Sequence, residues 1–142
     1  MKKLLFFSFF SLALLMFGCS STPSPRDVTM DFVGSVIEGD TLSLKQCFDV
    51  DAMVAYRMKV SPPADSTQTP EYYRNRIMKD ITGEGGVRQY WKNSTPIVNN
   101  QLVKGDTAEV ELTILDKQLG RTDYSKVYLY RSKNGWRVFN FQ

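Results

Sequence analysis

The chain has 142 residues, of which 18 are lysine or arginine, 15 are aspartate or glutamate and none is histidine. The lack of histidine excludes Ser-His-Asp and Cys-His catalytic arrangements and removes the commonest protein metal ligand, so we expect no metal and no cofactor. Two of the basic residues lie at the extreme N-terminus, and without them 16 basic side chains balance 15 acidic ones, which gives no electrostatic basis for binding nucleic acid.

Residues 1–18 have the pattern of a lipoprotein signal peptide. Lys2 and Lys3 provide a positive start, and the run from Leu4 to Phe17 carries no charge. This run is shorter than the roughly 20 apolar residues of a membrane-spanning helix, so export is favoured over insertion. The segment Leu15-Met16-Phe17-Gly18-Cys19 resembles the lipobox of bacterial lipoproteins. An ordinary signal peptide with an incidental cysteine is the alternative, but no A-x-A-like cleavage site lies nearby.

The lipobox resemblance implies that Cys19 becomes a lipid-bearing N-terminus, followed by a short polar linker over residues 19–24. Such an anchor, of the palmitate-bearing kind, makes the membrane the first partner and places the protein in the cell envelope. Ser20, rather than aspartate, follows the cysteine, and by resemblance to sorting in Gram-negative bacteria this implies the outer membrane, facing the periplasm. Cys47 is then the one remaining thiol, so no intramolecular disulfide can form, and we expect a small buried apolar side chain.

Residues 25–142 are predicted to form a single domain that begins with helices. Ser24 and Pro25 suit the start of a first helix, which Gly39 ends. Gly34 inside this helix is attributed to close packing against a sheet. Asp40 is a candidate cap for a short helix over 42–48.

A third helix is predicted to run through roughly Met58, capped by Asp49 or Asp51. Pro62 and Pro63 indicate a loop over 61–69. Another helix is predicted to begin at Thr69-Pro70 and to end at the glycines from Gly83.

From Thr95 onward the periodicity changes to that of strands, and 107–115 alternates between apolar and polar residues. Asn134-Gly135 predicts a two-residue hairpin turn, which would pair Tyr130 with Phe139 and Tyr128 with Phe141. A two-residue turn at Leu119-Gly120 would likewise place Val110 opposite Leu129. This register gathers the apolar residues on one face: Ala108, Val110, Leu112, Ile114, Val127, Leu129, Trp136 and Val138.

The same register places an aromatic group on the opposite face of the sheet, formed by Tyr128, Tyr130, Phe139 and Phe141. Exposed apolar patches often mark association sites, so these residues are a candidate interaction surface, most simply for a second copy of the chain. Two alternatives stay open: the loop 61–69 covers the group, or the register is wrong and the aromatics belong to the core.

Helices followed by an antiparallel meander indicate an α+β fold. Val28 to Asp40 is similar to the opening helix and Gly-Asp turn of nuclear-transport-factor-2-like domains, and 104–110 and 133–138 are similar to two of their strands. The strongest likeness is to small bacterial lipoproteins of that superfamily, sometimes called lumazine-binding-like, whose function is uncharacterised. The resemblance implies N-terminal helices packed on a curved antiparallel sheet, often around a cone-shaped cavity, and brings no catalytic residue with it.

Two functions remain open from the sequence. The first is a lipid-anchored, non-catalytic module that binds a second copy, an envelope protein or a small apolar ligand. The second is an enzyme of the same fold that uses a tyrosine and a carboxylate in the cone cavity. The scarcity of catalytic side chains favours the first.

Overall fold

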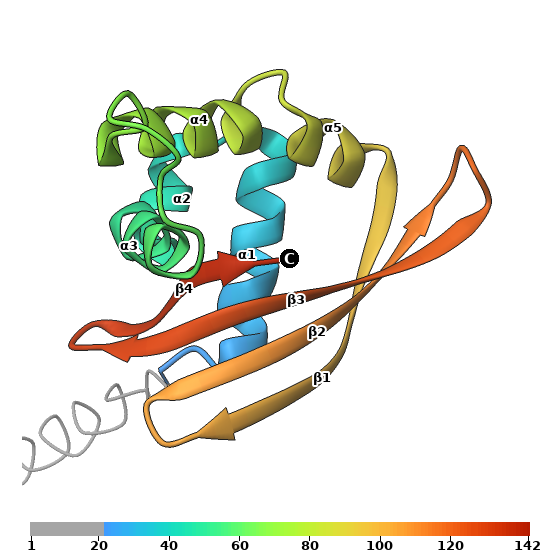
Figure 1. Ribbon diagram of the computed structural model, residues 1–142. Helices are drawn as coiled ribbons and strands as arrows, with labels where there is room; N and C mark the ends of the chain where they lie inside the picture. The colour runs from blue at the N-terminus through green and yellow to red at the C-terminus, as the bar shows by residue number, and fades with distance from the viewer. Residues whose placement is uncertain (1–21) are drawn as a thin grey trace, which may run out of the picture.

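The computed structural model describes residues 22–142, which form five helices followed by a four-stranded sheet (Figure 1). The helices are α1 (Pro25–Glu38), α2 (Thr41–Cys47), α3 (Val50–Val60), α4 (Pro70–Thr82) and α5 (Gly86–Lys92). The strands are β1 (Ser94–Lys104), β2 (Thr107–Asp116), β3 (Arg121–Ser132) and β4 (Gly135–Phe141), which pair in chain order as an antiparallel meander. The sheet curves around α1, and α2 to α5 lie on the same side. The predicted α+β fold is confirmed. Within the described range, no helix is both long and apolar enough to cross a membrane.

The ends of α1 follow the capping residues in the sequence. The Ser24 hydroxyl accepts a hydrogen bond from the Asp27 amide, and the Asp27 carboxylate accepts one from the Ser24 amide. This reciprocal pair satisfies amides that would otherwise lack partners at the helix start. At the other end Gly39 has φ of +72°, a conformation that side chains with a Cβ rarely adopt. A Cβ at Gly39 would also lie 2.9 Å from the Arg88 guanidinium carbon. Both the backbone conformation and the close approach of Arg88 therefore favour glycine at this position.

Three further caps are as predicted. Asp40 accepts hydrogen bonds from two amides at the start of α2, Asp49 caps α3, and the Thr69 hydroxyl caps α4. Asp51, the alternative cap for α3, instead accepts a 2.8 Å hydrogen bond from Arg74 Nε. The short helix α5 was not predicted, because no side chain caps its start.

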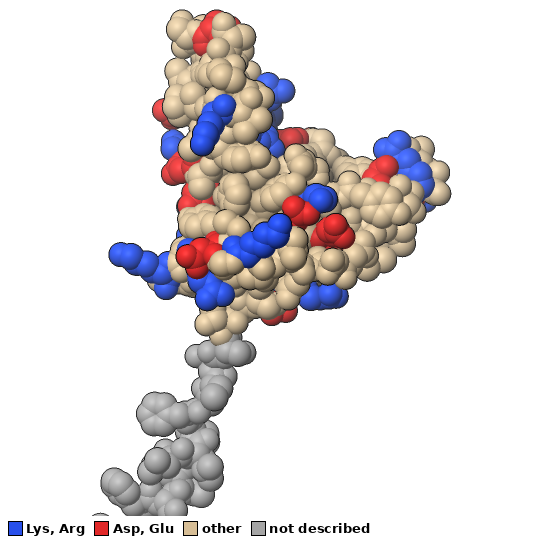
Figure 2. All heavy atoms as spheres, turned by 60° about the horizontal axis from the view of Figure 1, so that its bottom comes forward, with Lys and Arg blue, Asp and Glu red and all other residues tan. Residues whose placement is uncertain are grey.

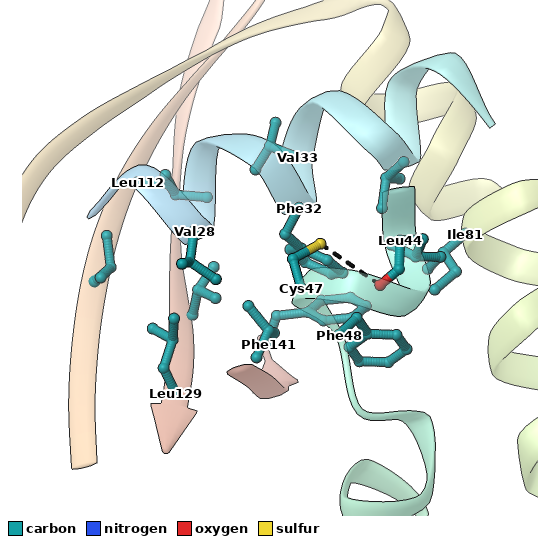
Figure 3. Close-up of a cluster of buried hydrophobic side chains, with 14 of the residues drawn as sticks. Val28, Phe32, Val33, Leu44, Cys47, Phe48, Ile81, Leu112, Leu129 and Phe141 are labelled. Atoms are coloured by element: carbon teal, nitrogen blue, oxygen red, sulfur yellow. Dashed lines mark hydrogen bonds between the residues drawn. The ribbon is translucent and has the colours of Figure 1, made fainter. Parts of the chain in front are cut away.

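The centre of the cone is filled by aromatic side chains from distant parts of the chain. Phe32 of α1 lies 5.3 Å from Phe48, 5.7 Å from Trp91 and 5.5 Å from Phe141, measured between ring centroids. Figure 3 shows Phe32, Phe48 and Phe141 together beneath α1, with Val28, Leu112 and Leu129 beside them. All of these side chains are buried. The interior beneath α1 is therefore a packed core.

The register between β2 and β3 differs from the predicted one by two residues. Val110 pairs with Val127 rather than Leu129, because the connection is a four-residue loop, 117–120, and not a two-residue turn. A shift of two keeps every side chain on its face of the sheet. The predicted set of core residues on the sheet is consequently buried, as expected.

The register between β3 and β4 was predicted wrongly, and the error moves one of the four surface aromatics. The turn is Lys133-Asn134, closed by Ser132 opposite Gly135, so Leu129 pairs with Val138 and Tyr130 with Arg137. A bulge at Phe139 then shifts the pairing by one residue, which places Phe141 opposite Val127. Phe141 is only 9% exposed and belongs to the core. The bulge leaves Tyr128, Tyr130 and Phe139 together on the outer face.

Gly34 is not explained by close packing, contrary to the prediction. A Cβ at this position would meet no atom within 4 Å. Gly34 lines a surface groove of about 450 Å³ between α1, α2 and the β3–β4 hairpin. The missing side chain of Gly34 therefore leaves space for the groove, and it is not needed for α1 to pack against the sheet.

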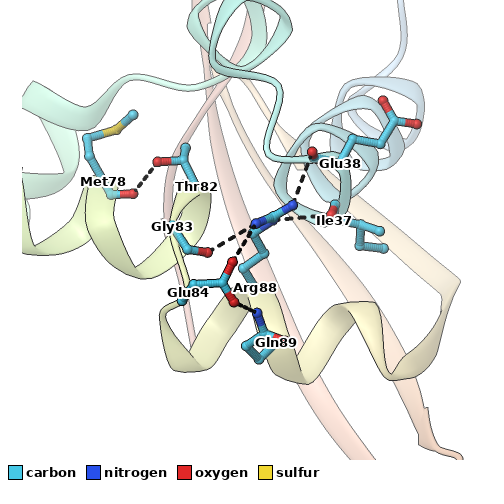
Figure 4. A network of polar contacts seen from close by, with 8 residues as sticks. All are labelled: Ile37, Glu38, Met78, Thr82, Gly83, Glu84, Arg88 and Gln89. Carbon is cyan, nitrogen blue, oxygen red and sulfur yellow. Dashed lines mark hydrogen bonds and ion pairs between the residues drawn. The ribbon is translucent and has the colours of Figure 1, made fainter.

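Arg88 joins three helices through backbone carbonyl groups (Figure 4). Its guanidinium donates to the carbonyl oxygens of Ile37 at 3.3 Å, Glu38 at 3.2 Å and Gly83 at 3.2 Å. These carbonyls belong to the ends of α1 and α4, where intrahelical partners are missing. A cation also interacts favourably with the negative end of a helix dipole. Arg88 of α5 thus fixes how α1, α4 and α5 meet.

Candidate functional site

At one end of the sheet β2 and β3 continue past β4 (Figure 1). An open recess lies at this end. The last backbone hydrogen bonds between β3 and the segment that contains β4 are exchanged by Lys126 and Gln142, so residues 121–125 of β3 project beyond β4 toward α5. We call this the mouth recess. Its volume is about 430 Å³, and it is lined by Val87, Tyr90, Trp91, Ile114, Arg121, Asp123, Tyr124, Ser125, Phe141 and Gln142.

The floor of the mouth recess is apolar and rigidly packed. Trp91, Ile114 and Phe141 are each less than 10% exposed, and the Trp91 and Phe141 rings lie 5.6 Å apart. Behind them the Phe32 ring packs against Trp91 and Phe141 and fills the interior of the cone. Tyr124, which is 79% exposed, stands at the rim. A ligand would therefore rest on an aromatic floor at the mouth and would not enter the centre of the domain.

A tyrosine–carboxylate pair forms the polar side of the mouth recess. The Tyr90 hydroxyl donates a hydrogen bond to Asp123, and Arg121 lies 3.1 Å from the same carboxylate and 3.8 Å from that of Asp116. Burial and the neighbouring Asp123 carboxylate raise the pKa of Tyr90, so the phenol keeps its proton at neutral pH. This pair can accept and donate hydrogen bonds to a ligand.

Comparison with known proteins identifies the fold. No family model matches the chain, and no curated protein matches its sequence. Among solved structures, a Campylobacter jejuni protein named as a candidate NTF2-like transpeptidase superposes with a TM-score of 0.53 at 14% identity, over 82% of this chain and 97% of that one. The chain has the nuclear-transport-factor-2-like fold. At this identity the likeness establishes the fold and not the activity.

Two further solved structures share the same superfamily name at lower similarity. A Streptomyces avermitilis protein named as a candidate dehydratase of the NTF2-like family has a TM-score of 0.45 and 14% identity, over 80% of this chain and 88% of that one. An NTF2-like protein of unknown function from Cytophaga hutchinsonii has a TM-score of 0.43 and 11% identity, over 86% of this chain and 89% of that one.

A second tyrosine–carboxylate pair in this NTF2-like domain has a structural role. The Tyr130 hydroxyl donates to Asp49 at 2.6 Å, and the same carboxylate caps α3 through the Ala52 amide at 2.9 Å. Burial opposes ionisation of Asp49, but these hydrogen bonds prevail and lower the pKa of its carboxyl. The pair ties β3 to the start of α3, and it lies outside the mouth recess.

The outer aromatic surface consists of three of the four predicted residues. The Phe139 ring lies 6.5 Å from Tyr128 and 6.1 Å from Tyr130, and Tyr56 of α3 packs on it edge-to-face at 5.7 Å. All three sheet residues are half-buried, and Tyr56 of α3 shields part of the group. The remaining sheet residues, Tyr128, Tyr130 and Phe139, stay a candidate interaction surface, whereas Phe141 does not belong to it.

Charges on the NTF2-like domain are mixed, and Cys19 lies outside the described residues. On the face in Figure 2, Lys and Arg side chains alternate with Asp and Glu, without a continuous patch of one sign. Between residues 22 and 142 no three His, Cys, Asp or Glu side chains converge on a common point. The expectations of no metal, no cofactor and no nucleic acid remain predictions.

Cys47 is a buried core residue, as expected. Its thiol contacts the carbonyl oxygens of Ser43 and Leu44 at 3.5 and 3.6 Å. Burial, with a smaller contribution from Asp31, raises the pKa of the Cys47 thiol from 9.0 to about 11. Thiolate, the reactive form, is therefore scarce at neutral pH. A redox or nucleophilic role is not supported by this environment.

The raised pKa of Cys47 gives a pH-dependent prediction. The folded domain holds the thiol proton more tightly than the unfolded chain, so stability is unaffected below about pH 9 and falls by up to roughly 2 kcal/mol by pH 11. Denaturant unfolding of wild type and Cys47→Ala between pH 8 and pH 11 measures this. The stability difference between the two should change in that window, because the tyrosine contributions are common to both. A difference that does not vary with pH would contradict the assignment.

Proposed function

We propose that the chain is an exported lipoprotein, anchored through Cys19, whose domain binds a small, largely apolar ligand at the mouth recess without catalysing its conversion. The observation that carries this proposal is the mouth recess itself, an open space of about 430 Å³ above an aromatic floor. Small-ligand sites typically have about 300–1,000 Å³ and apolar linings with a few polar groups. The Tyr90–Asp123 pair supplies such polar groups.

The position of the proposed anchor suits this role. The start of α1 lies beside β1, where the Arg26 amide donates to Gln101 Oε1 at 3.1 Å. In Figure 1 this end of the domain is opposite the β2–β3 hairpin that bounds the mouth recess. The linker from Ser20 to Ser24 spans at most roughly 20 Å. An anchored domain would therefore sit close to the bilayer of the cell envelope, with the mouth recess directed away from it.

Binding of the neutral apolar probe N-phenyl-1-naphthylamine tests the proposal. The probe should bind with a Kd on the order of micromolar and should take up excitation energy from Trp91, which forms part of the floor. Val87→Phe, which narrows the recess from α5, should weaken binding at least about tenfold. Ile97→Phe, a comparable aliphatic-to-aromatic change at an exposed position on β1, is the control and should bind like wild type.

Two results would contradict the proposal. One is the absence of saturable binding to the wild-type protein. The other is equal binding to Val87→Phe and Ile97→Phe, which would place the probe elsewhere on the surface.

An enzyme that uses Tyr90 and Asp123 is the second candidate function, because these two groups meet inside the mouth recess. We rank it second, since the raised pKa of Tyr90 keeps the phenol protonated and Asp123 is already paired with Arg121. A ligand recovered chemically unchanged after incubation supports binding. Conversion by wild type, but not by Tyr90→Phe, would favour the enzyme.

A further inference from the structure

A second recess lies between α3, α4 and the end of β4, separated from the mouth recess by Phe141. We call it the α3 recess. Its volume is about 340 Å³, and its walls include Tyr56, Arg57 and Val60 of α3, Tyr73 of α4, and Asn140 and Phe141 of β4. Nothing in the proposed function uses this recess.

Asn140 is a buried polar side chain that faces the α3 recess without a partner. It is only 5% exposed, yet no group in residues 22–142 makes a hydrogen bond with its side-chain amide. The polar atoms of this amide are accessible from the recess, because among residues 22–142 the one fully enclosed side-chain N or O atom without a partner is Arg137 Nε. The amide offers two N–H donors and one acceptor to whatever occupies the recess.

Arg57 lies on the same recess and also lacks an acidic partner within the described chain. Its guanidinium stacks over the Phe141 ring, with the Cζ atom 5.7 Å from the ring centroid. Among the arginines of residues 22–142, Arg74, Arg88 and Arg121 form ion pairs with carboxylates, and the others, including Arg57, do not. Burial lowers the pKa of Arg57, while the field of Asp80 raises it and that of Arg76 lowers it. The Arg57 guanidinium is half-buried and stacks on the Phe141 ring. Its hydrogen-bond donors are therefore available to an anionic ligand.

We propose that the α3 recess binds a small organic carboxylate, held by the Arg57 guanidinium and the Asn140 amide. The planar guanidinium matches a carboxylate, with which it can form two parallel hydrogen bonds. Arg57 is the single cation among the residues that line the recess, which suits a monoanion better than a doubly charged phosphate. Tyr56, Val60 and Phe141 provide apolar walls for a hydrocarbon body.

Titration of the full-length protein, followed by amide chemical shifts, tests this inference. The probes are benzoate, octanoate and N-acetylphenylalaninate, with benzamide as the neutral analogue of benzoate and phenyl phosphate as a dianion. At least one carboxylate should bind with a Kd on the order of millimolar or tighter, with shifts at Arg57 and Asn140. Benzamide and phenyl phosphate should bind at least about tenfold more weakly. No saturable carboxylate binding, equal binding of benzamide, or tighter binding of phenyl phosphate would each overturn the proposal.

Variants distinguish a built site from a general surface effect. Arg57→Gln and Asn140→Leu should each weaken carboxylate binding at least about tenfold, whereas Arg76→Gln, which changes a nearby arginine outside the recess, should not. Asn140→Leu should leave the domain folded, because the amide that it removes makes no hydrogen bond within residues 22–142. Carboxylate binding that is unchanged in Asn140→Leu would contradict the role of Asn140. Val87→Phe at the mouth recess should leave carboxylate binding unchanged, so the two sites can fail independently.

Discussion

Replacing Phe141 by alanine is expected to destabilise the domain by about 3–5 kcal/mol, the usual range for removing a buried aromatic ring. The Phe141 ring contacts Phe32 and Trp91 at the centre of the cone, so the cavity left behind would have rigid walls on several sides. Equilibrium unfolding in urea, monitored by tryptophan fluorescence and circular dichroism, measures the loss.

Tyr128→Ala is the matched comparison, because the sequence alone predicted that both residues lie on one surface. Tyr128 lies on the outer face and is half-buried, so its replacement should cost far less than that of Phe141 and should leave the domain folded. If Tyr128, Tyr130 and Phe139 form a contact between two copies, Tyr128→Ala should also weaken self-association in sedimentation equilibrium. Equal destabilisation by the two variants would contradict the register around the Phe139 bulge.

Replacing Cys19 by serine is expected to abolish lipid attachment completely. A multiply acylated cysteine anchors a protein stably to a bilayer, and Cys19 is the cysteine that follows the lipobox-like segment. Metabolic labelling with a palmitate analogue, followed by separation of membrane and soluble fractions, should show a labelled membrane form for wild type and an unlabelled, unprocessed or soluble form for the variant.

Cys47→Ser controls for the second cysteine. Cys47 is buried and its thiol is protonated at neutral pH, so this variant should still incorporate the label. Equal labelling of wild type and Cys19→Ser would refute the proposed anchor.

Features set by neighbouring residues could be predicted from the sequence. The caps at Ser24, Asp40 and Thr69, and the helix end at Gly39, depend on groups within a few positions along the chain. The face of the sheet on which each strand residue lies could also be predicted, because side chains alternate with a period of two and a register error of two residues leaves each on the same face. Only an odd shift exchanges faces, and the bulge at Phe139 is such a shift.

The position of the β3–β4 turn was predicted wrongly because hydrogen bonds of one side chain, Ser132, determine it. The Ser132 hydroxyl donates to the Gly135 carbonyl at 2.8 Å and accepts from the Asn134 amide at 3.2 Å, which favours Lys133-Asn134 over Asn134-Gly135 as the turn. The usual preference for Asn-Gly turns carries no information on such a hydrogen bond.

The candidate sites depend on contacts between residues far apart in sequence. Tyr90 and Asp123 are 33 positions apart, and no local pattern pairs them. Arg57 and Asn140 line the same recess because α3 packs against the end of β4. The sequence contains one usable signal for the mouth recess, namely the adjacent aromatic residues Tyr90 and Trp91 shortly after the glycine-rich segment that starts at Gly83.

The most direct test of the proposed ligand site is a map of amide chemical shifts for the ¹⁵N-labelled protein titrated with N-phenyl-1-naphthylamine. The account predicts that the largest shifts occur at Tyr90, Ile114 and Asp123, around the mouth recess. Shifts confined to Tyr128, Tyr130 and Phe139 on the outer face, or no saturable shifts at all, would contradict it.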